Sequence, residues 1–123
     1  MESNYIIAFN NLLLKFNQEI IELFPEETDF KLYKTALNLI ITTDKYKLSK
    51  LFKTYIIQYK QNILDKNEIF FLNNEYKEIT KKTEGIQLII DKIKKYWSIL
   101  SNNNKEQIWT YLHSLIKLND MII

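Results

Sequence analysis

The sequence contains no cysteine, no arginine and no valine, and it has a single glycine, a single proline and a single histidine. Without cysteine the chain forms no disulfide framework, no thiolate metal site and no cysteine nucleophile. One glycine and one proline exclude a glycine-rich phosphate loop, and they are too few for the turns of a small all-β fold. The longest uninterrupted apolar run is the segment 5–9. A membrane-spanning helix needs ~20 such residues, so none is expected.

Isoleucine, lysine and asparagine supply 50 of the 123 residues. All three have AT-rich codons, so an AT-rich genome explains this bias better than a requirement of folding does. The hydrophobic fraction of 46% excludes a disordered chain. The net charge of +2 is too small to indicate polyanion binding by itself. Because lysine lacks the bidentate geometry of arginine, sequence-specific recognition of nucleic acid is not expected either.

Apolar residues recur with the period of an α-helix along most of the chain. The clearest case is a helix over about 4–24, which the single proline, Pro25, ends. Asp44 is a candidate N-cap for a long helix over about 45–65, and Asn103 with Glu106 resembles a capping box. The inward residues expected for the helix over 4–24 are Ile6, Phe9, Leu13, Phe16, Ile20 and Leu23.

Three further helices are expected. One carries Phe30 to Ile41, one covers about 84–100, and one follows the capping box and carries Ile108 to Leu118. The segment 66–83 is less regular, with room for a short helix. The length corresponds to one domain covering residues 1–123. The sequence therefore predicts an all-α fold, a compact bundle of five to six amphipathic helices. We expect the helices over 4–24 and 84–100 to be the most central ones.

No arrangement of residues points to catalysis. His113 is the only imidazole, and it is expected to be a half-exposed surface side chain rather than a general base. The carboxylates Glu22, Glu26, Glu27 and Asp29 cluster around the first loop, where charge at a helix start and solvation explain them without a metal ion. We therefore expect a non-enzymatic protein with no catalytic residues, no cofactor, no metal ion and no small-molecule substrate.

Charge is unevenly distributed along the chain. Residues 1–29 carry one lysine and six acids, whereas residues 30–63 carry seven lysines and one acid. Within the predicted helix over 45–65, the lysines of the outer face surround one apolar residue, a pattern that favours docking of an acidic and hydrophobic protein partner. The predicted partner-binding patch consists of Lys50, Lys53, Ile57 and Lys60.

Three alternatives to this interpretation stay open. The lysine face is also compatible with simple solvation, because single exposed apolar residues are normal. It is compatible with sequence-nonspecific binding of nucleic acid as well, for which affinity would fall steeply with salt. The apolar C-terminus, residues 121–123, either docks on its own core or joins the broad face of the first helix in a homo-oligomer contact.

Several segments resemble small helical proteins of large nucleocytoplasmic DNA viruses. The residues that carry the resemblance are Phe24–Pro25, the segments 29–34 and 96–100, and the segment 108–112. Those proteins have no assigned activity, so the resemblance implies a viral source and no reaction. Together these observations predict a helical interaction or structural protein that works through protein–protein contacts. Its expected location is the cytoplasm, which for a viral protein is the host cytoplasm or the virion.

Overall fold

The computed structural model describes the backbone of residues 2–73 and 84–122 and the side chains of residues 4–73 and 91–122. Every regular element of these residues is a helix, which confirms the all-α prediction. Seven of the described elements are α-helices, more than the five to six expected. They are α1 (Glu2–Leu23), α2 (Thr28–Thr43), α3 (Lys47–Tyr55), α4 (Lys60–Leu64), α5 (Glu68–Asn73), α7 (Glu84–Trp97) and α8 (Asn102–Asp120).

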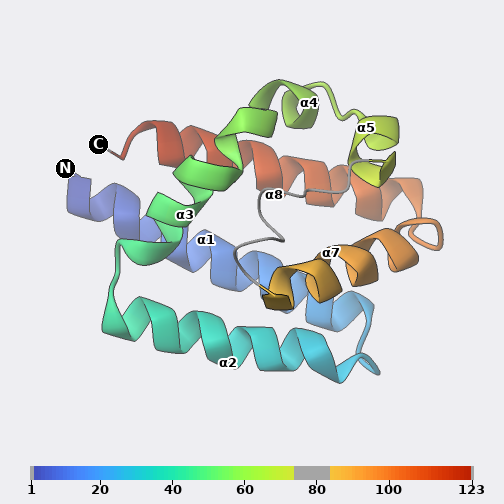
Figure 1. The fold of residues 1–123 in the computed structure, drawn as a ribbon, viewed down its shortest axis with the longest axis horizontal. Helices are drawn as coiled ribbons and strands as arrows, with labels where there is room; N and C mark the ends of the chain where they lie inside the picture. Colours follow the sequence, from blue (N-terminus) through green and yellow to red (C-terminus); the bar gives the residue numbers. More distant parts are fainter. Residues whose placement is uncertain (1, 74–83, 123) are drawn as a thin grey trace.

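The larger number arises because the helix expected over 45–65 is not continuous. α3 ends at Tyr55, and a single 3-10 turn, η1 (Ile57–Tyr59), connects it to the short helix α4. A 3-10 turn has three residues per turn instead of 3.6, so it changes which side chains face inward. Figure 1 shows the resulting bend between α3 and α4.

α1 and α8 form the centre of the described structure. α1 packs against both α2 and α8, and α3 crosses α1 and α8 obliquely (Figure 1). The central position of the first helix is therefore as expected, but its central partner is α8 and not the helix over 84–100. In α7 the tryptophan at the end, Trp97, is buried, whereas the side chains of residues 84–90 lie outside the described ones.

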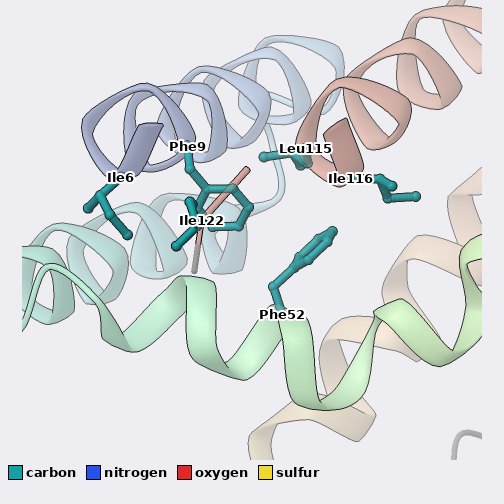
Figure 2. Close-up of a cluster of buried hydrophobic side chains, with 6 residues drawn as sticks. All are labelled: Ile6, Phe9, Phe52, Leu115, Ile116 and Ile122. Carbon is teal, nitrogen blue, oxygen red and sulfur yellow. The ribbon is translucent and has the colours of Figure 1, made fainter. Parts of the chain in front are cut away.

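The first core cluster joins α1, α3, α8 and the segment after α8. Figure 2 shows its six side chains converging from these elements. The rings of Phe9 and Phe52 meet edge to face with centroids 5.3 Å apart, a favourable geometry for two aromatic rings. Ile122 is 5% exposed within this cluster, so the C-terminal segment docks on its own core at this residue. The members are Ile6, Phe9, Phe52, Leu115, Ile116 and Ile122.

The second core cluster consists of Trp97, Ile108 and Trp109, and it holds the turn between α7 and α8. The two indole rings lie 5.5 Å apart, and the ring of Phe71 from α5 lies 5.3 Å from Trp97. Phe16 and Ile20 of α1 pack against this cluster, so the inward face predicted for the first helix contributes to the core. No helix in the described parts of the chain combines the length and the apolar character needed to cross a membrane.

Candidate functional site

Two lysines of the predicted patch are used inside the chain, at the C-terminal end of α8. The Lys53 Nζ donates to the backbone oxygens of Asn119 and Ile122, at 3.3 and 2.9 Å. The Lys60 Nζ lies 2.7 Å from an Oδ2 of Asp120. The C-terminal end of a helix carries partial negative charge, so the two ammonium groups beside it stabilise the end of α8.

Ile57 also faces the chain's own core. It is half-buried rather than exposed, and it packs against the first core cluster. The reason is the 3-10 turn over 57–59, because a helical projection that assumes 3.6 residues per turn does not hold across it. Three of the four residues in the predicted patch therefore contact other parts of this chain.

Lys50 remains on the surface and belongs to a smaller group on α3. Its exposed neighbours on the helix are Lys47, Leu51 and Thr54. Together with Lys50 these residues form the α3 basic face. The Leu51 side chain is 41% exposed. Neither Lys47 nor Lys50 has an ion-pair partner among the described side chains, and no acid occurs in the sequence between Asp44 and Asp65.

The predicted patch does not include Lys47, Leu51 or Thr54. The side of α3 that faces inward carries Ser49, which is 2% exposed. Its backbone oxygen accepts a hydrogen bond from the Nδ2 of the fully buried Asn119, at 3.1 Å. A small residue permits the close approach of α3 and α8 at this point. Hydrophobicity alone does not predict that a serine is buried. The spacing of residues 47, 50 and 54, by contrast, predicts from the sequence that they share one helix face.

A second group of charged side chains connects the α1–α2 turn to α7. The Lys92 Nζ lies 3.0 Å from an oxygen of Glu27 and 3.1 Å from an oxygen of Asp29. The other Glu27 oxygen accepts a hydrogen bond from the Tyr96 hydroxyl at 2.7 Å, and the Tyr96 ring stacks on Phe24. Two of the four acids expected at a helix start, Glu27 and Asp29, thus hold α7 in place.

This network keeps its groups in their ordinary protonation states near neutral pH. The Tyr96 hydroxyl and the Lys92 ammonium hold the pKa of Glu27 below its usual range. Hydrogen bonds to Glu27 and Asp29 raise the pKa of Lys92. The Glu27 carboxylate likewise raises the pKa of Tyr96. Each pKa is shifted away from neutrality, whereas a general acid or base works best with a pKa near the working pH.

The lowered pKa of Glu27 makes its contribution to stability depend on pH. We expect the Glu27→Gln variant to be less stable than the parent protein above pH ~5, where the carboxylate is ionised in both the folded and the unfolded state. The difference should shrink as the pH falls through the folded-state pKa, which lies below the ordinary value of 4.5. Urea unfolding at a series of pH values measures it. Glu22→Gln, at an exposed position of α1, is the control, and an equal pH dependence in both variants would contradict the assignment.

The single histidine has a structural contact. The His113 Nε2 lies 2.8 Å from the backbone oxygen of Ile63, and since a carbonyl oxygen only accepts, Nε2 donates. The same oxygen accepts a hydrogen bond from the Lys66 backbone N–H at 3.0 Å, so His113 adds a second donor at the end of α4. Among the side chains that the structure describes, no three or more histidines or acids gather as metal ligands.

Comparison with known proteins gives no assignment. No family model, no curated protein and no solved structure matches the chain. The resemblance to proteins of large DNA viruses therefore stays a prediction.

Proposed function

We propose that this protein is a non-enzymatic interaction protein that docks an acidic, amphipathic protein segment on the α3 basic face. The observation that carries the proposal is the division of the lysines. Lys53 and Lys60 have partners within the chain, whereas Lys47 and Lys50 stand beside the exposed Leu51 without any ion-pair partner among the described side chains. Of the predicted patch, Lys50 is thus available to another molecule, and Lys47, which the prediction did not include, is available beside it.

The chemistry of this face determines the class of partner. Two ammonium groups one turn apart attract carboxylates, and residues 30–63 as a whole carry six net positive charges, which speeds encounter with an acidic partner. Leu51 supplies an apolar contact between them. A helical segment with glutamates beside leucines would match both features.

The described surface favours a protein partner over nucleic acid. Proteins that bind single strands without sequence preference stack bases on exposed aromatic rings. No aromatic side chain among residues 4–73 and 91–122 is exposed, including Tyr46 and Tyr55 at the two ends of α3. Lysine alone, without a stacking surface, supports only weak backbone contacts that salt screens.

The test uses a synthetic helical peptide with glutamates on one side and leucines on the other, followed by fluorescence anisotropy. We expect the double variant Lys47→Glu with Lys50→Glu to bind it about tenfold more weakly, or 1.4 kcal/mol. Glutamate in the first turn of α3 is favourable for the helix dipole, so the variant should stay folded. Leu51→Ala should weaken binding as well.

The matched control is Lys31→Glu with Lys117→Glu, two exposed lysines on α2 and α8 that give the same change in net charge. Retained binding in this control assigns the effect to the α3 basic face. An equal loss of affinity in both double variants would mean that the peptide binds by general electrostatic attraction and not at the α3 basic face. Binding of a thymidine oligonucleotide through Lys47 and Lys50, in place of the peptide, would replace the proposal with the nucleic-acid hypothesis.

A further inference from the structure

α2 carries a row of exposed apolar and small side chains along one face. Leu32 and Leu39 are 63% and 67% exposed, although both are large and apolar. Ala36 lies between them on the same face and is also exposed. α2 lies at the edge of the molecule, and its other side packs against α1 (Figure 1). The row is therefore free to meet another surface.

The row is symmetric about its own centre. Its centre is the midpoint between Thr35 and Ala36. Leu32 and Leu39 lie at equal distances from this midpoint, and Thr28 and Thr43 lie at equal distances farther out; all are exposed on this face. The same residue types thus recur at the same distances in both directions. An antiparallel copy of α2 placed on this row would set each Leu32 against the other copy's Leu39.

The charges at the two ends of α2 share this centre. Glu26 and Lys45 lie at equal distances from the midpoint, and both are exposed. Neither has an ion-pair partner among the described side chains, and the Lys45 ammonium lies 5.2 Å from the centroid of the Tyr46 ring. In an antiparallel pair each Glu26 would approach the other copy's Lys45, whereas a parallel pair would bring like charges together.

From this placement we propose that a second copy of this chain occupies the row, so that two α2 helices pack antiparallel around a twofold axis between Thr35 and Ala36. The small side chains at the axis let the helices approach closely, and the leucines on both sides supply the apolar contact. The row itself carries no charge, so packing buries no unpaired ion. This contact is separate from the α3 basic face, and either can fail without the other.

The absence of cysteine from the sequence allows a direct test by disulfide cross-linking. A disulfide needs Cα atoms about 4.4–6.8 Å apart, and Ala36→Cys places the two thiols beside the twofold axis. Thr43→Cys is the control, because residue 43 would lie opposite residue 28 and about 22 Å along the helix from its own copy. Under mild oxidation we expect a covalent dimer from Ala36→Cys and monomer from Thr43→Cys. Equal cross-linking of both variants, or none in Ala36→Cys, would overturn the proposal.

Sedimentation of the cysteine-free protein gives an independent measurement. We expect the parent protein to shift from monomer to dimer mass as its concentration rises, and Leu39→Glu to stay monomeric with unchanged helical circular dichroism. Ile69→Glu is the control, since Ile69 is 74% exposed on α5 and lies outside the row. A parent protein that stays monomeric, or a dimer that Leu39→Glu does not dissociate, would contradict the proposed contact.

Discussion

Replacing Trp97 by alanine should lower the free energy of unfolding by about 3–5 kcal/mol, the usual cost of deleting a large buried aromatic side chain. Trp97 is 2% exposed and contacts Trp109 and Phe71, so one side chain joins α7 to α8 and α5. Neighbouring helices would have to move together to close the resulting cavity. Urea unfolding followed by circular dichroism measures the loss.

Trp97→Phe separates packing from hydrogen bonding at this position. The Trp97 Nε1 is buried and has no hydrogen-bond partner among the described residues, so its N–H contributes no bond that phenylalanine would lack. We therefore expect the phenylalanine variant to recover more than half of the stability that the alanine variant loses. An alanine variant within 1 kcal/mol of the parent protein, on the order of a surface substitution, would show that the second core cluster does not hold the helices together.

The second large effect is expected at Lys53. Lys53→Met keeps most of the aliphatic stem but removes the ammonium that bonds to the oxygens of Asn119 and Ile122. Hydrogen bonds from a charged donor to helix-end carbonyls stabilise more than neutral ones, so we expect a loss of about 1–2 kcal/mol. Amide hydrogen exchange should rise mainly in the last turn of α8 and the residues after it, because these lose the contact with the Lys53 ammonium.

Lys50→Met is the matched control for this substitution. It makes the same chemical change one turn away on the same helix, at a lysine without an ion-pair partner among the described side chains. We expect its free energy of unfolding to stay within ~0.5 kcal/mol of the parent value. Equal losses in the two variants would mean that Lys53 contributes only as a general surface charge.

The sequence predicted the features that depend on local periodicity. The helix over 4–24 appears as α1 with its inward face as expected, and Pro25 lies in the turn that follows. The start of α8 was misplaced by a short distance. Ser101 is its N-cap and accepts a hydrogen bond from the Asn104 backbone, whereas the sequence suggested Asn103. A run of asparagines offers several residues that can cap a helix, so the choice depends on where the chain leaves the preceding turn.

Features that depend on contacts between distant segments were not predictable. The bend at 57–59 turns Ile57 inward, and nothing in the local sequence marks it, since neither glycine nor proline occurs there. The sequence grouped Lys50, Lys53 and Lys60 on one face, but the partner of Lys53 and Lys60 is a helix end 60 to 69 residues away in sequence. Only the arrangement of α3, α4 and α8 separates lysines that hold the fold from those left on the surface.

The division of the lysines into two groups is the central claim, and nuclear magnetic resonance tests it most directly. Titrating the acidic helical peptide into 15N-labelled protein reports which backbone amides sense the partner. We expect the chemical-shift changes to concentrate at Lys47, Lys50, Leu51 and Thr54, with the amides at the end of α8 little affected. Changes centred on the end of α8 or on α2, or no change at saturating peptide, would contradict the assignment of the α3 basic face as the binding surface.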